Sequence, residues 1–284
     1  MKSKRFLLFL FLFCLFLTAG AQNKIKPWKG IRPVSRVRLW HYTPQSDTVK
    51  NTAIIILPGG SYRYLGIRQE GHAVACMLAQ HGYAAFVLRY STGMYGHSYP
   101  VMMEDIQRAV MWVKERAETY GIDPHKVGIL GFSAGGHLSG WMGTYFDDDH
   151  LKKYELVPAL SLRPAFVGMI YPVVTMADDI VHKKSRDNLL PWDLPLSLRQ
   201  YMSLEQNVRE DMPPVFLMTC LDDPVVNPEN SDRYKEALVK KGVPHKYLVY
   251  EEGGHGFGYR PEGKNKTAKI WIAEFLQWLK EHNF

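Results

Sequence analysis

The sequence has little cysteine, and this scarcity excludes a fold held together by many disulfides. Three cysteines occur in 284 residues, and Cys14 lies in an amino-terminal apolar run, which leaves Cys76 and Cys220. Exported domains that depend on disulfides carry many more. Both remaining cysteines lie in apolar runs, where a buried thiol is as natural as a disulfide. The sequence therefore leaves their pairing open.

A strong excess of charge of one sign is also missing. The chain has 35 Lys and Arg residues against 28 Asp and Glu residues, a formal net charge of +7. Three of the basic residues lie within residues 1–21, so the rest of the chain is closer to neutral. Nucleic-acid-binding proteins gather basic residues on one face. We therefore expect no nucleic-acid partner.

The sequence lacks an apolar run long enough to cross a membrane. The run from Phe6 to Leu17 is shorter than the ~20 residues that a spanning helix requires. It follows three basic residues and precedes an A-x-A arrangement that ends at Ala21. This pattern predicts a secretory signal peptide, residues 1–21, cut after Ala21. We expect a secreted or periplasmic protein with no membrane anchor after cleavage.

Internal repeats, Ser/Pro-rich linkers and low-complexity tracts are missing after the signal, so residues 22–284 are expected to form one domain. Short β-rich runs alternate with stretches of helical period. This alternation predicts an α/β fold with a mainly parallel central sheet and helices on both faces. The expected strands are 52–57, 84–88, 126–130, 166–171, 215–220 and 246–250, with an edge strand at 34–42, and the expected helices are 69–81, 101–120, 134–145, 229–241 and 266–281.

Residues 176–212 interrupt this alternation. The segment carries Pro191, Pro195, Trp192 and several charges. It is expected to pass over one edge of the sheet, either as a small lid or as a plain surface connection.

One serine, Ser133, lies in the sequence GFSAGGH, residues 131–137. It follows an expected strand and precedes an expected helix, which is the context that a G-x-S-x-G turn requires. The serine of such a turn takes an unfavourable backbone conformation, and glycines two positions before and after it relieve the crowding. The turn exposes the Ser133 hydroxyl and places the backbone N–H of Ala134, at the start of the helix, beside it.

A serine hydroxyl needs a base, and the base needs an orienting acid. Asp222 and Asp223 follow one later strand, and His255 follows the next, between glycines. The order serine, acid, histidine, with each residue at the end of its own strand, predicts a catalytic triad of Ser133, Asp223 and His255. Asp222 is the alternative acid. His137 is expected to pack near the site.

The stretch LPGGSYRYLG, residues 57–66, follows the first central strand and is called the PGG loop below. Backbone N–H groups in such a loop stabilise an oxyanion beside the nucleophile. We expect Gly60 and Ser61 to form an oxyanion hole together with Ala134. Tyr62 is expected close to the acyl pocket.

The segments PGGSY, GFSAGGHL, YPVV, DDPVVNPENS and GGHGFG, in this order, resemble α/β-hydrolase carboxylesterases of the acetyl xylan esterase type, which are related to the hormone-sensitive-lipase-like esterases. The resemblance covers residues 50–282. It implies the α/β-hydrolase fold and a serine esterase that needs no metal and no organic cofactor. In the PGG loop, Pro58 and Ser61 depart from the family's H-G-G-G pattern.

The resemblance also implies the partner, a small-molecule or oligosaccharide ester such as acetylated xylan fragments. The aromatic residues Tyr62, Tyr64 and Trp192 offer flat faces that suit the apolar faces of sugar rings. Tyr62 and Trp192 are the predicted substrate contacts.

Two alternatives remain open. A serine peptidase of the prolyl-oligopeptidase kind shares the serine turn and the triad order, although about thirty residues between the signal and the first central strand would not hold the β-propeller usual in that group. The second alternative is a catalytically inactive carbohydrate-binding protein on a hydrolase fold. Its expected sign is a missing triad residue, and none is missing.

Overall fold

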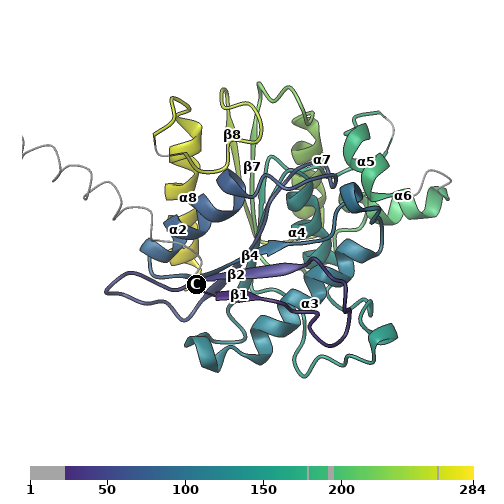
Figure 1. Cartoon of the computed structure of the whole chain (residues 1–284). Helices are drawn as coiled ribbons and strands as arrows, with labels where there is room; N and C mark the ends of the chain where they lie inside the picture. The colour runs from purple at the N-terminus through teal and green to yellow at the C-terminus, as the bar shows by residue number, and fades with distance from the viewer. Residues whose placement is uncertain (1–22, 178, 191–194, 261) are drawn as a thin grey trace, which may run out of the picture.

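A single sheet of eight strands runs through the molecule, which was analysed as a computed structural model (Figure 1). The structure describes residues 23–177, 179–190, 195–260 and 262–284, so the predicted signal peptide and Trp192 lie outside the described residues. The strands are β1 (Asn23–Ile25), β2 (Arg38–Tyr42), β3 (Ala53–Leu57), β4 (Ala84–Arg89), β5 (Val127–Phe132), β6 (Val167–Ile170), β7 (Val215–Cys220) and β8 (His245–Tyr250).

The strand order is β1-β2-β4-β3-β5-β6-β7-β8. β1, β2 and β4 pair antiparallel, and every pair from β4 to β8 is parallel. Parallel strands that are covered on both faces read as continuous apolar runs. β3 (AIIIL) and β5 (VGILGF) fit this rule, because each of their residues is buried. The predicted α/β fold with a mainly parallel sheet is confirmed.

Helices cover both faces of the sheet (Figure 1). The α-helices of the described residues are α2 (Ala73–Gln80), α3 (Val101–Glu115), α4 (Ala134–Thr144), α5 (Lys183–Leu189), α6 (Leu196–Met202), α7 (Glu229–Lys240) and α8 (Thr267–Glu281). Ile54 and Ile56 of β3 belong to the core under α2 and α8. Ile55 and Leu57 belong to the core under α3, α4 and α7. This alternation follows from the two-residue period of a strand.

Several predicted boundaries are wrong. The edge strand expected at 34–42 begins at Arg38, and β1 was not expected. The helix expected at 101–120 ends at Glu115, followed by a 3₁₀ turn at Glu118–Tyr120. The helix expected at 69–81 begins with a π-helical turn at Arg68–His72 before α2. Tertiary packing sets these ends, and hydrophobic period alone does not mark them.

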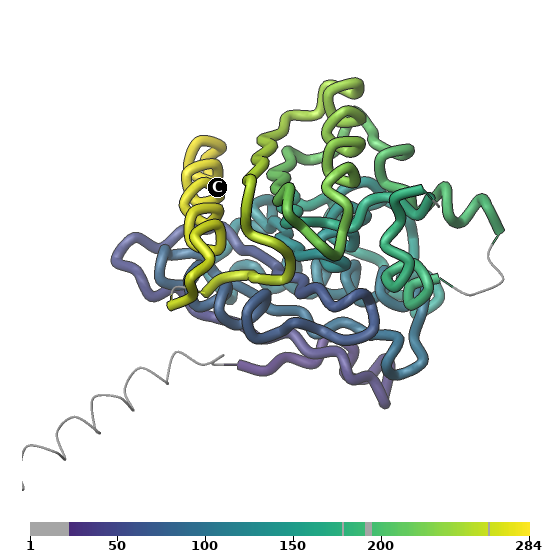
Figure 2. Tube along the Cα trace, turned by 90° about the horizontal axis from the view of Figure 1, so that it is seen from above, coloured from purple at the N-terminus to yellow at the C-terminus, as the bar shows by residue number. Residues whose placement is uncertain are grey.

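The carboxyl ends of β3, β5, β7 and β8 lie at one edge of the sheet because these strands are parallel. The segment after β8, residues 251–260, is called the histidine loop below. Its Tyr259 N–H donates to the Gln69 carbonyl. Figure 2 shows this yellow segment next to the blue segment that leads into α2.

Within residues 176–212, the described parts form α5, α6 and a 3₁₀ turn at Leu204–Gln206. The segment is attached to the residues that follow β6 and to α4. The Leu204 N–H donates to the Val174 carbonyl, and the Met202 carbonyl contacts the imidazole of His137. The lid role stays a prediction.

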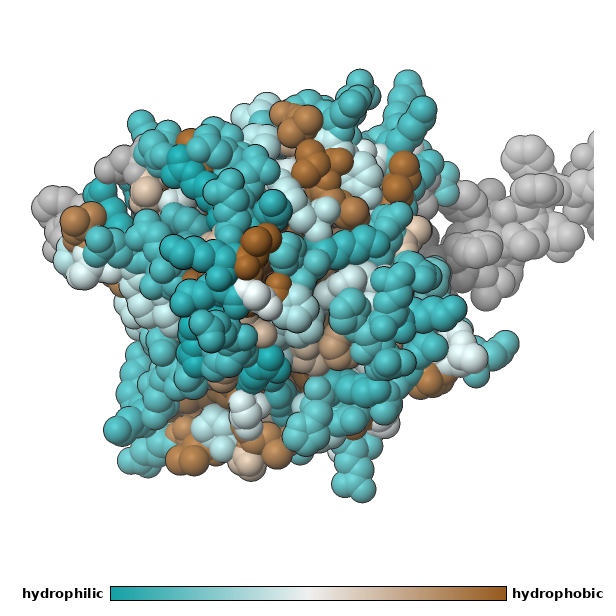
Figure 3. Space-filling view, turned by 180° about the vertical axis from the view of Figure 1, so that it is seen from behind, coloured by the Kyte–Doolittle hydropathy of each residue, from teal (hydrophilic) through white to brown (hydrophobic). Residues whose placement is uncertain are grey.

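The structure settles the cysteine pairing, because no disulfide joins Cys76 and Cys220. On the face seen in Figure 3, apolar side chains lie in small separate groups on a mostly hydrophilic surface. Among the residues that the structure describes, no helix has the length and apolar character of a membrane span.

Close packing around β5 yields a prediction about stability. A Cβ added to Gly128 would lie 2.2 Å from Cζ of Phe166. Gly128→Ala is therefore expected to lower the free energy of unfolding by about 1–3 kcal/mol, because an overfilled core forces side chains out of their preferred rotamers. Urea unfolding measures this change.

The control is Phe166→Leu, which removes the colliding ring atoms. The double variant Gly128→Ala/Phe166→Leu is expected to lose less stability than the two single variants summed, because the substituted residues share one contact. Strictly additive losses would contradict the collision.

Candidate active site

Ser133 lies in a turn whose backbone leaves no space for side chains at its glycines. Its φ is 53° and its ψ is −118°, between β5 and α4. A Cβ on Gly131 would lie 2.0 Å from the Gly135 carbonyl oxygen, and a Cβ on Gly135 would lie 2.1 Å from the Leu57 carbonyl oxygen. The glycines are thus required because backbone segments touch there.

The three residues predicted as a triad are brought together. His255 Nε2 lies 2.8 Å from Ser133 Oγ, and His255 Nδ1 lies 2.6 Å from Asp223 Oδ2. Asp223 Oδ1 also accepts the N–H groups of Val225 and Val226. The side chain of Asp223 has no exposed surface, and that of His255 is 11% exposed. A carboxylate that accepts from Nδ1 leaves Nε2 free to accept the serine proton.

Asp222 makes different contacts. Its carboxylate accepts the N–H of Gly254 at 2.8 Å and the N–H of Gly253 at 3.1 Å. These two bonds hold the pKa of the Asp222 carboxyl below its usual value. Asp222 therefore shapes the histidine loop, and Asp223 contacts the imidazole.

The PGG loop lies directly against the serine turn. A Cβ on Gly59 would lie 2.8 Å from Ser133 Cβ. The Gly59 N–H donates to Glu70 Oε2 at 2.8 Å, so it is already used. Among the described residues, none accepts a hydrogen bond from the N–H of Gly60 or Ser61. Both residues have positive φ, 134° and 54°.

Ala134 begins α4, directly after Ser133. The first N–H groups of a helix have no partner within the helix and point toward its start. The predicted donors Gly60, Ser61 and Ala134 thus belong to segments that meet at Ser133.

Tyr62 does not lie where a substrate contact is expected. Its side chain is fully buried, and its hydroxyl lies 2.8 Å from His137 Nδ1. His137 Nε2 lies 2.8 Å from the Met202 carbonyl, and burial lowers the pKa of His137 to about 4. The structure therefore places Tyr62 in the core, contrary to the predicted substrate contact, and His137 packs near the site as expected.

Two residues beside the triad were missed by the sequence reasoning. Glu70 is 3% exposed, and its Oε1 accepts the Tyr171 hydroxyl at 3.0 Å. Burial raises the pKa of the Glu70 carboxyl, against the effect of its bonds from Tyr171 and Gly59. The sequence contained a sign of this role. Glu70 lies four residues before the buried Val74, so it places a charged residue on the apolar face of the expected helix.

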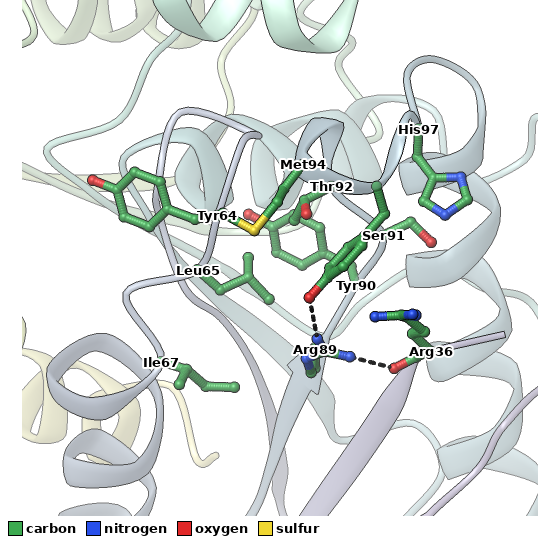
Figure 4. Close-up of a pocket in the computed structure, with 11 residues that line it drawn as sticks. Arg36, Tyr64, Leu65, Ile67, Arg89, Tyr90, Ser91, Thr92, Met94 and His97 are labelled. Carbon is green, nitrogen blue, oxygen red and sulfur yellow. Dashed lines mark hydrogen bonds between the residues drawn. The ribbon is translucent and has the colours of Figure 1, made fainter.

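A cavity of about 160 Å³ adjoins the PGG loop (Figure 4). The N–H of Met94 donates to the Arg63 carbonyl and so ties the cavity's rim to that loop. Arg89 donates to the Tyr95 hydroxyl and to the Arg36 carbonyl. The lining residues are Arg36, Tyr64, Leu65, Ile67, Arg89, Tyr90, Ser91, Thr92, Met94, Tyr95 and His97. Within the described ranges, no cluster of three or more His, Cys, Asp and Glu side chains is placed to hold a metal ion.

Known proteins are similar over most of the chain. Residues 41–238 match the BD-FAE family, and residues 199–283 match the Dienelactone hydrolase family. The acetylxylan esterase of Xylanibacter ruminicola is 31% identical over 276 residues, which cover 95% of this chain and 53% of that protein. The endo-1,4-β-xylanase B of Butyrivibrio fibrisolvens is 36% identical over 220 residues, which cover 74% of this chain and 33% of that protein.

The chain therefore spans about half, or a third, of the length of these curated relatives. It matches a solved structure at nearly full length. The crystal structure of the acetyl ester-xyloside bifunctional hydrolase from Caldicellulosiruptor lactoaceticus has a TM-score of 0.81 and 30% identity, and the match covers 94% of this chain and 98% of that one. The α/β-hydrolase fold that the motifs predicted is confirmed, and the chain belongs to the BD-FAE family.

Proposed function

We propose that this chain is a serine carboxylesterase in which Ser133 is the nucleophile, His255 the general base and Asp223 the orienting acid. The observation that carries the proposal is the continuous path from Ser133 Oγ through both nitrogens of His255 to Asp223. A serine hydroxyl becomes a useful nucleophile only with such a base in hydrogen-bond reach.

In the proposed reaction, Ser133 Oγ bonds to the ester carbonyl carbon while its proton moves to His255 Nε2. The carbonyl oxygen becomes an oxyanion that accepts hydrogen bonds from the N–H of Ala134 and of Gly60 or Ser61. The carbon–alkoxy bond then breaks, and His255 gives its proton to the departing alcohol. Water, deprotonated by His255, attacks the acyl-enzyme. The bond from the acyl carbon to Ser133 Oγ then breaks, His255 returns the proton to Oγ, and the acid is released.

The proposed substrate is a short acyl ester, chiefly acetyl, on a carbohydrate such as a xylan-derived oligosaccharide. The names of the similar proteins support this substrate, since they include an acetylxylan esterase, a xylanase and an acetyl ester-xyloside hydrolase. The predicted signal peptide is in keeping with a substrate outside the cytoplasm.

The cavity beside the PGG loop supports a place for the sugar. Tyr64 is 49% exposed and Tyr95 is 43% exposed, and both line it. Exposed tyrosine rings offer flat apolar surfaces with a polar tip, which suits a sugar ring. Tyr64 thus takes the place that the sequence reasoning gave to Tyr62.

The assignment of the nucleophile is tested by Ser133→Ala. Ester hydrolysis is expected to fall by a factor on the order of 10⁶, because triad residues act as a unit. A fluorophosphonate probe should label the wild type and leave Ser133→Ala unlabelled, as judged by intact-protein mass. Ser46→Ala is the matched control and should be labelled normally, because this partly exposed serine lies in the loop after β2, which ends beside the start of the parallel strand β4. Labelling of folded Ser133→Ala would refute the nucleophile, and an unlabelled wild type would favour the inactive carbohydrate-binding alternative.

The choice between the neighbouring aspartates is tested by two isosteric variants. Asp223→Asn is expected to lower kcat for an aryl acetate by about 10⁴, because an amide at this place holds the imidazole in the wrong tautomer. Asp222→Asn loses only bonds to loop backbone and is expected to change kcat less than about tenfold. Steady-state kinetics on both variants decide the question. The opposite ranking would move the acid to Asp222.

The substrate class is tested with a panel of esters and amides. We expect kcat/KM to fall from acetyl to butyryl to octanoyl aryl esters, and we expect acetate release from acetylated xylo-oligosaccharides. Each extra methylene that must enter a pocket of fixed size is disfavoured. A preference for octanoyl, or aryl ester cleavage without any acetate release from sugars, would leave a general carboxylesterase. Faster cleavage of prolyl peptide amides would favour the peptidase alternative.

A further inference from the structure

The proposed mechanism leaves one buried carboxyl group beside the triad unused. Glu70 is 3% exposed and lies in the π-helical turn Arg68–His72 that precedes α2. π-helical turns are rare and occur often at functional positions. A buried carboxyl group next to an active site needs a physical reason, because burial disfavours its charged form.

Glu70 joins the two loops that carry the site. Its Oε2 accepts the N–H of Gly59 in the PGG loop at 2.8 Å. Its Oε1 accepts the hydroxyl of Tyr171 at 3.0 Å, and the Tyr171 oxygen accepts the N–H of Gly258 in the histidine loop at 2.9 Å. The path from Gly59 to Gly258 therefore runs through one carboxyl group and one phenol.

The pattern of donors fits a carboxylate. The Gly59 N–H can only donate, and the Tyr171 oxygen already accepts from Gly258, so its own proton is available to Glu70. A carboxylate accepts both protons, one on each oxygen. The proton of a neutral carboxyl group could not go to the Gly59 N–H, and on the Tyr171 side it would displace the proton that the hydroxyl donates to Glu70.

The bond to Gly59 bears on the oxyanion hole. It uses the N–H of Gly59, so the next N–H groups of the loop, those of Gly60 and Ser61, remain for the oxyanion. A Cβ on Gly59 would lie 2.8 Å from Ser133 Cβ and 3.0 Å from Glu70 Oε2. Gly59 therefore lies between the Glu70 carboxylate and the serine turn, and no side chain fits at its position.

Tyr171, which is bonded to the same carboxylate, also lies against the base. Its ring lies 4.7 Å from that of His255 between centroids. Its backbone is held at φ 37° directly after β6, with its N–H bonded to the Met218 carbonyl. A non-glycine residue with this φ is strained, and such strain gathers at functional sites.

We propose that Glu70 is a positioning residue for ester hydrolysis: its carboxylate, through Gly59 and Tyr171, holds the PGG loop and the histidine loop in register and places a second negative charge behind His255. This inference rests on the proposed function of Ser133 and His255. The imidazole becomes positively charged in the transition state, so a nearby negative charge lowers the barrier and favours the protonated base.

The sign of the pH effect follows from the charge. A histidine base works only when neutral, so activity falls on acidification. Glu70→Gln removes a negative charge that favours the protonated base, so the acid limb of the rate profile should move to lower pH. The other titratable groups facing His255 or Glu70 are Asp223, His182, Tyr90, Tyr171 and Arg260, and all of them remain in Glu70→Gln.

The test uses purified full-length Glu70→Gln, which keeps the shape of the side chain and removes its charge. With an aryl acetate, kcat is expected to fall about tenfold to a hundredfold, less than the loss of a whole oxyanion donor. The midpoint of the acid limb of kcat is expected to move down by about half a pH unit or more. Circular dichroism checks that the variant is folded.

The matched control is Tyr90→Phe, which leaves both Glu70 and Tyr171 unchanged. The Tyr90 hydroxyl donates to the Pro58 carbonyl of the same loop, so Tyr90→Phe loosens the loop without removing a carboxylate. Its acid limb should stay at the wild-type position. A folded Glu70→Gln whose acid limb also stays there overturns the proposal, because a merely structural role lowers kcat without moving the limb.

If Glu70→Gln does not fold, Tyr171→Phe decides the question. It keeps the ring on His255 and removes only the hydroxyl that links Glu70 to Gly258. A kcat within about twofold of the wild type would overturn the proposed link from Glu70 through Tyr171 to the histidine loop, because losing a hydrogen bond to a charged group should lower kcat by more than twofold. Fluorophosphonate labelling of Ser133 separates this outcome from the proposed function, because failure to label the wild type counts against the nucleophile and not against Glu70.

Discussion

Close backbone contact around Ser133 is the constraint on which the rest of the site depends. The carbonyls of Gly135 and Leu57 occupy the places where side chains on Gly131 and Gly135 would lie, and Gly59 fits between Ser133 and Glu70. The turn therefore holds one strained serine against two neighbouring segments of main chain. Backbone strain of this kind costs on the order of 1–3 kcal/mol and persists only where the surroundings fix it. The buried strands β3 and β5 supply that rigidity.

The parallel sheet then decides which side chains can reach the serine. β5, β7 and β8 end at one edge, so the segments after them meet although they are far apart in the chain. Each loop is fixed by an acid of its own. Asp223 holds the imidazole, Asp222 holds the glycines before it, and Glu70 holds the PGG loop and, through Tyr171, the end of the histidine loop. Asp222 and Glu70 accept protons only from backbone N–H groups and a phenol, so neither competes with His255 for the Ser133 proton.

The aromatic residues of the PGG loop are divided between the core and the surface. Tyr62 pairs in the core with His137 of α4, and burial lowers the pKa of that imidazole to about 4, so it carries no charge near neutral pH. Tyr64 and Tyr95 line an open cavity on the other side of the PGG loop. Neighbouring residues of one loop thus serve different ends, Tyr62 in the core and Tyr64 at an exposed cavity.

The sequence alone determined the alternation of strands and helices, the glycine-flanked Ser133 and the order of Ser133, Asp223 and His255, because hydrophobic period and turn chemistry act over a few residues. It did not determine element ends, such as the stop of α3 at Glu115, or the burial of Tyr62. It also left open which aspartate meets the imidazole and missed the link from Glu70 to Tyr171, which are 101 residues apart. These features depend on contacts between distant segments, and only the tertiary structure, which brings the ends of parallel strands to one edge, decided them.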